Sequence, residues 1–165
     1  MSPTLKRLVA FDTMTPRDVA ALLASARALA QAAAAGATQP LLRGKNFGLV
    51  SEDDDDGEAA LFRRAALDLG AHVAHIRTSL SAQSTPHEVQ HTARMLGRLY
   101  DLVECQGMAA TLVQQVSDAA GVPVFDGLAS PAHPTVRLAE QLGADAAPGD
   151  ARRFVLQAVL LGTLA

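Results

Sequence analysis

His87, Glu88 and His91 form a short pattern in which two histidines stand four residues apart and a glutamate follows the first. On a helix, such histidines lie one turn apart and can bind Zn²⁺, and the glutamate serves as general base in zinc proteases. The extended motif that carries a third ligand does not follow here, and the segment falls in the first turns of a helix predicted to start at Pro86. We therefore interpret the pattern as a chance match and expect no protease, with an incidental metal site at His87 and His91 as the alternative.

A run of carboxylates near residue 50 is the second candidate site. It consists of Glu52, Asp53, Asp54, Asp55, Asp56 and Glu58. Charge runs of this kind usually face water, and here Asp56 would simply cap the following helix. Several carboxylates on one loop can also bind a cation such as Ca²⁺ or Mg²⁺, a polyamine or a basic peptide, although the spacing and glycine of an EF-hand loop are missing. Both interpretations stay open.

Cys105 is the single cysteine of the chain. One cysteine excludes an internal disulfide and a cysteine-rich zinc site, which is consistent with a reducing compartment. Cys105 ends an apolar segment, and the sequence around it offers no base or cationic group that would activate a thiol. We expect it to pack in the core.

Alternating helices and strands are predicted to position these residues. Helices are expected at about 16–35, 57–69, 86–99, 109–120, 134–142 and 151–164, and strands at 47–50, 73–76, 102–105 and 122–125. Thr15 before Pro16 is a typical helix start, and Gly121 a typical helix end. Strands that alternate with helices of this length favour right-handed crossovers and a parallel sheet covered on both faces. The predicted fold class is α/β, in three layers around a parallel sheet of four or slightly more strands.

The composition is that of one compact domain. The 165 residues are 49% hydrophobic, 4% aromatic and 19% charged, with a net charge of −3. This charge provides no basic field for nucleic acid, so we expect no nucleic-acid partner. No apolar run approaches the roughly 20 residues of a membrane span, and no long apolar segment follows Lys6 and Arg7, so we expect no membrane association and a cytoplasmic location.

Several segments in order along the chain resemble the ornithine/aspartate carbamoyltransferase family, and specifically its carbamoyl-phosphate-binding, N-terminal domain. They are Gly44-Lys45-Asn46-Phe47-Gly48-Leu49-Val50, Ala66-Leu67-Asp68-Leu69-Gly70-Ala71-His72-Val73, Thr92-Ala93-Arg94-Met95-Leu96-Gly97-Arg98 with Asp101-Leu102-Val103, Ala119-Ala120-Gly121-Val122-Pro123-Val124-Phe125-Asp126-Gly127-Leu128 and His133-Pro134-Thr135. The resemblance covers nearly all of residues 5–142. It implies that domain's fold and, because family trimers are built mostly through it, a homo-oligomer that is most simply a trimer.

The resemblance also indicates that the phosphate site is degenerate. In the family, a Ser-Thr-Arg-Thr-Arg motif holds the phosphate at a helix N-terminus, where the helix dipole and free amides favour an anion. The aligned positions here are Asp55, Asp56, Gly57, Glu58 and Ala59. Gln106 replaces a second phosphate-binding arginine, and Val136 replaces the glutamine of His-Pro-x-Gln. His133 is kept, either for packing or as a remaining ligand contact.

The end of the chain suggests an altered domain organisation. Residues 152–161 resemble the family's C-terminal helix, which returns from the amino-acid-binding domain to pack on the first domain. Residues 143–149 would then take the place of the amino-acid-binding domain. We expect a single domain over 1–165, with its body at 1–142, a linker at 143–149 and the returning helix at 150–165.

These features predict a carbamoyltransferase-like pseudo-enzyme with no catalytic residue and no cofactor. It would not bind carbamoyl phosphate and would act through association with itself or with a full-length carbamoyltransferase. One alternative is residual carbamoyl transfer completed by residues of another chain. A second is a small binding module whose acidic loop accepts a cation or a basic partner.

Overall fold

A computed structural model describes residues 11–52, 57–147 and 149–164. Its centre is a four-stranded, wholly parallel sheet in the order β2-β1-β3-β4. The strands are β1 (Asn46–Val50), β2 (His72–Ile76), β3 (Leu102–Cys105) and β4 (Val124–Asp126). The two inner strands, β1 and β3, are apolar and almost wholly buried, as expected for strands covered on both faces. The predicted α/β fold with a parallel sheet is confirmed.

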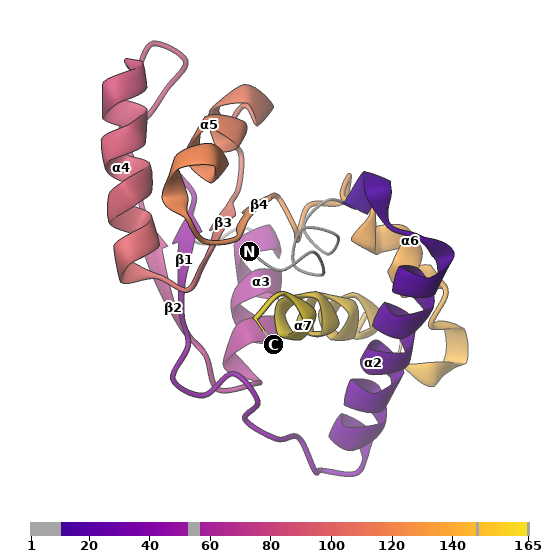
Figure 1. Cartoon of the computed structure of the whole chain (residues 1–165). Coiled ribbons are helices and arrows are strands. Elements are labelled where there is room, and N and C mark those ends of the chain that lie inside the picture. Colours follow the sequence, from indigo (N-terminus) through magenta and orange to yellow (C-terminus); the bar gives the residue numbers. More distant parts are fainter. Residues whose placement is uncertain (1–10, 53–56, 148, 165) are drawn as a thin grey trace.

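One face of the sheet is covered by α4 (Pro86–Leu99) and α5 (Ala110–Ala120) (Figure 1). Thr85 caps α4, because its hydroxyl accepts a hydrogen bond from the Glu88 amide and the Glu88 carboxylate accepts one from the Thr85 amide. The two helices approach so closely that a Cβ atom on Gly97 would lie 1.8 Å from the carbonyl oxygen of Ala120. Only glycine fits at this contact.

The other face is covered by α3 (Gly57–Leu67) and α7 (Ala151–Leu164). Around α7 pack α2 (Pro16–Ala34) and α6 (Thr135–Glu140), so this side of the molecule is two helical layers deep (Figure 1). Two short 3-10 turns are also present, η1 (Phe11–Thr13) before α2 and η2 (Gly143–Asp145) between α6 and α7. None of the described helices is long and apolar enough to cross a membrane.

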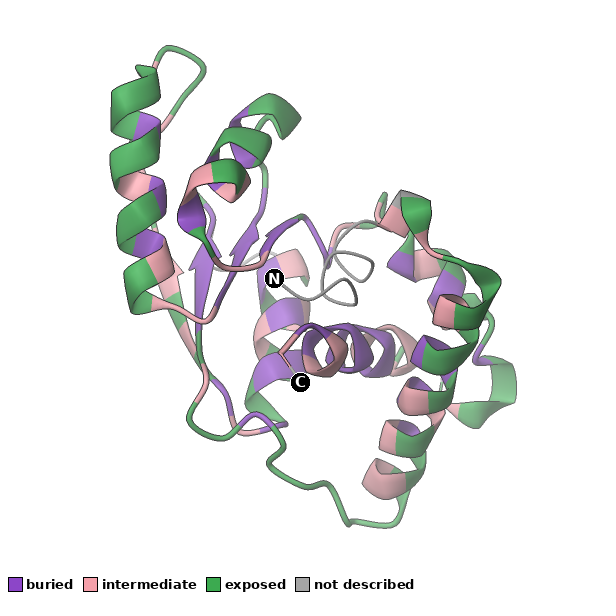
Figure 2. Ribbon diagram, viewed as in Figure 1, coloured by how far each residue is buried: buried purple, intermediate pink, exposed green. Residues whose placement is uncertain are grey.

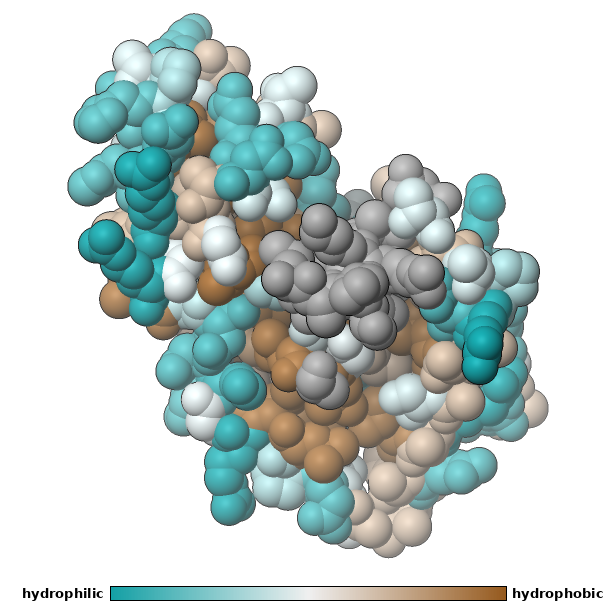
Figure 3. Space-filling view, in the orientation of Figure 1, coloured by the Kyte–Doolittle hydropathy of each residue, from teal (hydrophilic) through white to brown (hydrophobic). Residues whose placement is uncertain are grey.

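The last helix, α7, is the centre of this second core. Its residues 154–160 are all buried, against α2, α3 and α6 of the same chain (Figure 2). The side-chain nitrogen Nε2 of Gln157, which is buried among them, donates to the Ala65 carbonyl oxygen at 3.2 Å. Near the end of α7, Leu161 and Leu164 are half-buried, and apolar residues gather over α7 on the face seen in Figure 3. The helix is thus buried mostly by its own chain.

Candidate functional site

A cavity of about 410 Å³ lies where the carboxyl ends of β3 and β4 meet the start of α3. Its lining comprises Glu58, Gly107, Asp126, Gly127, Ser130, Ala132, His133 and Pro134. In an open parallel sheet, the carboxyl ends of the strands are the edge at which ligand-binding loops gather. The cavity is therefore the first candidate for a functional site.

Glu104 of β3 is fully buried next to the loop that follows the lining residue Gly127. Its carboxylate accepts hydrogen bonds from the amides of Leu128 and Ala129, at 2.9 and 3.2 Å, and from the Gln106 side-chain nitrogen at 3.4 Å. Burial raises the pKa of Glu104 to about 8, although the three donors favour its charged form. Glu104 thus ties β3 to the loop that follows β4.

Arg152 holds the same loop from the other side. From the first turn of α7, its guanidinium donates to the Thr135 hydroxyl oxygen at 3.0 and 2.8 Å, to the Leu128 carbonyl oxygen at 3.2 Å, and to the Ser130 carbonyl oxygen. Burial lowers the pKa of Arg152, and the negative charges of Glu104 and Glu58 oppose that shift. The peptide group between Leu128 and Ala129 therefore lies between the Glu104 carboxylate, to which its N–H donates, and the Arg152 guanidinium, which donates to its oxygen.

His133 is the histidine among the residues that line the cavity. Its Nδ1 accepts a hydrogen bond from the Thr135 amide at 3.2 Å, so the neutral ring carries its proton on Nε2. The ring also meets the Phe11 ring edge-on, with centroids 4.6 Å apart. Burial, and then the charge of Arg152, lower the pKa of His133 to about 4. It is therefore a neutral group near pH 7.

The electrostatics of the cavity favour a cation or a neutral hydrogen-bond donor over an anion. Among the described residues that line it, the ionisable side chains besides the neutral His133 are the acids Glu58 and Asp126. Arg152, which the Glu58 charge influences, is not among the lining residues, and its Nε and Nη2 atoms donate to Thr135, Leu128 and Ser130. A phosphate in this cavity would meet two carboxylates.

The family model for the carbamoyl-phosphate-binding domain of aspartate/ornithine carbamoyltransferases matches residues 6–144. The chain belongs to this family. It is 38% identical over 137 residues to an ornithine carbamoyltransferase of Actinobacillus pleuropneumoniae, a match that covers 83% of this chain and 41% of that protein. An ornithine carbamoyltransferase of Haemophilus influenzae is 39% identical with the same coverage. The chain thus spans about two fifths of the curated relatives it matches.

Solved structures of carbamoyltransferases have the same fold. The ornithine carbamoyltransferase of Pyrococcus furiosus superposes with a TM-score of 0.69 at 25% identity, over 82% of this chain and 43% of that one. An aspartate transcarbamoylase of Trypanosoma cruzi, solved with phosphate, superposes with a TM-score of 0.68 at 21% identity, over 85% and 46% of the two chains. The carbamoyltransferase-like α/β fold proposed from the sequence is confirmed, whereas α7 lies beyond the residues that the family model matches.

Only part of the predicted degenerate carbamoyltransferase site comes together in the cavity. Glu58 and His133 line it, and Gly57 begins α3. Gln106 is buried against Glu104, and Val136 is half-buried in α6. Of the acidic run, Glu52 is exposed, whereas Asp53, Asp54, Asp55 and Asp56 lie outside the described residues.

The other two sequence candidates lie away from the cavity. His87 and His91 are exposed in the first turns of α4, and the described part of the chain has no cluster of three or more His, Cys, Asp or Glu suited to a metal ion. Cys105 is buried and packs in the core under α4 and α5, as the sequence predicts.

Sequence reasoning missed Glu104, Arg152 and Asp126. The signal for Glu104 was available, because it is the single charged residue in the apolar strand Leu102–Cys105. A charge placed inside a buried strand indicates a hydrogen-bonded partner elsewhere in the fold. Its partners, Leu128 and Ala129, are 24 and 25 residues away and could not be found from the sequence pattern.

Proposed function

We propose that this chain is a carbamoyltransferase-like pseudo-enzyme that does not bind carbamoyl phosphate and acts through association with protein partners. The observation that supports this proposal most directly is the lining of the cavity at the carboxyl end of the sheet. Glu58 and Asp126 are its charged groups, where a phosphate ligand requires cations and hydroxyl or amide donors.

The electrostatic cost of an anion in this cavity is large enough to matter. One pair of like unit charges about 6 Å apart costs roughly 1.4 kcal/mol at an effective dielectric constant of about 40. Each lost charge-assisted hydrogen bond costs a further ~1.5–3 kcal/mol. Two carboxylates and a missing guanidinium therefore remove several kcal/mol of binding free energy. A ligand with a millimolar dissociation constant has a binding free energy of only about 4 kcal/mol in total.

Gln106 supports the same conclusion. To take the role of the family's phosphate-binding arginine, the Gln106 side chain would have to reach the cavity. It is instead buried just after β3 and donates to Glu104 at 3.4 Å. His133 stays neutral near pH 7 because its pKa is lowered to about 4, so it adds no positive charge. The described residues of the predicted phosphate site thus lack a free cation aimed at an anion.

Calorimetric titration with carbamoyl phosphate and with inorganic phosphate tests the first half of the proposal. We expect no binding at submillimolar concentration. The double variant Glu58→Thr with Gln106→Arg should raise phosphate affinity, whereas Glu140→Gln, an exposed acid-to-amide change on α6, should not. Submillimolar binding by the unchanged chain would refute the loss of the phosphate site and favour a residual transferase completed by another chain.

Association is the second half of the proposal, with a second copy or a full-length carbamoyltransferase as partner. Several large apolar side chains that the domain leaves exposed support it, namely Leu41, Leu67, Met95 and Leu99. Met95 and Leu99 lie one turn apart on α4, and contiguous apolar surface of this kind favours protein contacts. We expect a homo-oligomer, most simply a trimer. Light scattering that gives a monomer at high micromolar concentration, with no capture of a full-length carbamoyltransferase, would refute association.

The proposed unit is the whole of residues 1–165, in which 143–149 bridge the domain body and the returning helix. The close packing of α7 on α2, α3 and α6 supports this arrangement.

A cation-binding module is the second candidate function, because Glu58 and Asp126 line the same cavity. Titration with Mg²⁺, Ca²⁺ and Zn²⁺ distinguishes it, since only this candidate predicts saturable binding that Glu58→Gln weakens.

A further inference from the structure

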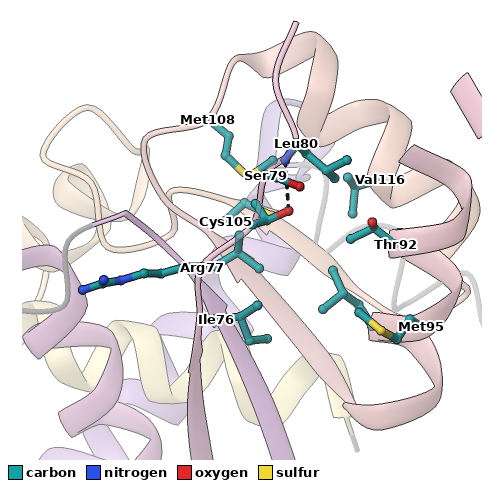
Figure 4. A pocket seen from close by; sticks show the side chains of 12 residues that line it. Ile76, Arg77, Ser79, Leu80, Thr92, Met95, Cys105, Met108 and Val116 are labelled. Atoms are coloured by element: carbon teal, nitrogen blue, oxygen red, sulfur yellow. Dashed lines mark hydrogen bonds between the residues drawn. The ribbon is translucent and has the colours of Figure 1, made fainter. Parts of the chain in front are cut away.

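A second cavity, of about 210 Å³, lies at the same edge of the sheet but on the face covered by α4 and α5 (Figure 4). The last residues of three neighbouring strands line it, namely Val50 of β1, Ile76 of β2 and Cys105 of β3. It is separate from the acidic cavity, with which it shares no lining residue.

The walls of this second cavity are largely apolar. Leu96 on α4, Val116 on α5 and Leu80 in the loop after β2 surround it, together with Met95 and Met108. Methionine is a flexible side chain that adapts its shape to a ligand. The one charged residue among the described lining is Arg77, and its side chain extends away from the cavity in Figure 4.

The size of the cavity defines a ligand class. An engineered apolar cavity of about 150 Å³ stays dry and binds benzene, so about 210 Å³ suits a molecule of roughly eight or nine non-hydrogen atoms. A charged ligand of this size would lose its hydration without a counter-charge. The ligand must therefore be neutral and mostly apolar.

Two hydroxyl groups that line the cavity are available to orient such a ligand, that of Thr92 on α4 and that of Ser79, which is exposed in the loop after β2. The Thr92 side chain projects from α4 toward the cavity in Figure 4, and within the described part of the chain its hydroxyl has no hydrogen-bond partner. The Thr78 hydroxyl, in contrast, already accepts a hydrogen bond from the Leu80 amide at 3.2 Å. The Cys105 thiol stays protonated, since burial raises its pKa to about 12.

We propose that the cavity between α4, α5 and the strand ends is a binding site for a small neutral molecule with an apolar body and one hydroxyl or carbonyl group. Thr92 makes the hydrogen bond to that group, and Met95, Met108 and Val116 contact the apolar body. This site shares no residue with the degenerate phosphate site, but it shares Met95 with the surface proposed for association. The occupant is a small molecule because about 210 Å³ is too little space for a helix or strand of a protein partner.

Methyl resonances of the methionines provide the test. In the full chain labelled with ¹³C-methyl methionine, p-cresol should shift the Met95 and Met108 signals in a saturable way. Met14 packs against the other core, so its signal should stay in place and report an intact fold. Toluene, which has the same body without the hydroxyl group, should bind more weakly.

Thr92→Val is the matched variant, because it keeps the shape of the side chain and removes the hydroxyl. It should weaken p-cresol binding about two- to tenfold, the value of one net hydrogen bond, and leave toluene binding unchanged. Absence of saturable shifts at Met95 and Met108 with either probe would overturn the proposal. So would Met95 shifts that depend on protein concentration and that neither probe changes, because a second copy of the chain would then be the occupant.

Discussion

Glu104 and Cys105 are neighbours in β3 that face opposite sides of the sheet, and burial raises the pKa of both. Glu104 belongs to the side of α3 and α7, where two backbone amides and Gln106 donate to it. Cys105 belongs to the side of α4 and α5, whose buried cluster is apolar. The same physical cause therefore produces a titratable network on one side and an inert thiol on the other.

The difference teaches where this fold can carry polar chemistry. The side of α3 and α7 is deeper, because α2 and α6 pack outside α7, and its loops supply backbone donors and acceptors to Glu104 and Arg152. The side of α4 and α5 has a single helical layer and a cavity beside Cys105. Polar function is expected on the first side, and apolar binding on the second.

The largest expected effect is the loss of packing in the deeper core. Leu156→Ala on α7 removes a fully buried side chain and should lower the free energy of unfolding by about 3–5 kcal/mol. Leu96→Ala on α4 should lower it by only about 2–3 kcal/mol, since Leu96 already borders a cavity and has fewer contacts to lose. Urea unfolding measures both values. Equal losses would remove the proposed difference in packing between the two sides.

Arg152→Met should have the next largest effect. It leaves the carbonyl oxygens of Leu128 and Ser130 without their guanidinium donor, which should lower the free energy of unfolding by about 2–4 kcal/mol. Arg153→Met is the control on the same helix. Arg153 is 12% exposed, pairs with Asp68 and Asp150 and lies 4.5 Å from the centre of the Phe154 ring, so its loss should lower the stability by about 1–2 kcal/mol. A larger effect at Arg153 than at Arg152 would contradict the role given to the buried network.

The pH dependence of stability tests the two shifted groups together. Glu104 keeps its proton in the folded state up to a pKa of about 8, above the ordinary value of 4.5, so its contribution to stability falls as the pH rises from about 4.5 to 8. His133 has a folded pKa of about 4, below the ordinary value of 6.5, so its contribution falls as the pH drops from about 6.5 to 4. The two trends oppose each other between pH 4.5 and 6.5, and Glu104 alone acts above that range.

One group that is protonated in the folded state and ionised in the unfolded state changes the free energy of unfolding by about 1.4 kcal/mol for each pH unit. We therefore expect the free energy of unfolding to fall by roughly 1–2 kcal/mol between pH 6.5 and 8. Glu104→Gln should remove this slope and leave the rise in stability with pH up to 6.5 that His133 causes. Urea unfolding at several pH values gives the slope, which is the quantity to compare because the amide also changes the hydrogen bonds to Leu128 and Ala129. A variant that keeps the slope would place the titrating group elsewhere.

The fold was largely predictable from the sequence because its signals are local. Thr15 and Thr85 mark the starts of α2 and α4 with capping residues three positions later, and the apolar strands are short and bounded by turns. Errors stayed at element ends. The last strand begins at Val124 rather than Val122, because Val122 and Pro123 lead into it, and α6 is limited to Thr135–Glu140.

The site was predictable only in part because its interactions are not local. Glu58 and His133 could be expected at the carboxyl end of the sheet from the alternation of strands and helices and from the family resemblance. Arg152 could not, since its partners Leu128 and Thr135 lie 24 and 17 residues away and meet it only after α7 packs on the domain body. The apolar cavity likewise depends on how α4 and α5 approach the strand ends, which no motif encodes.

The smallest expected effect concerns the thiol of Cys105. Its side chain is 1% exposed and its pKa is raised to about 12 by burial, with Glu104 and Asp126 contributing, so the nucleophilic thiolate is scarce at pH 8. A disulfide reagent such as dithionitrobenzoate should leave the folded chain unmodified at pH 8 and react fully in urea. If the thiol instead reacted quickly in the folded protein, the cavity beside Cys105 would open readily to solvent. Protection against the reagent by p-cresol would then locate that opening at the apolar cavity rather than on the side of Glu104.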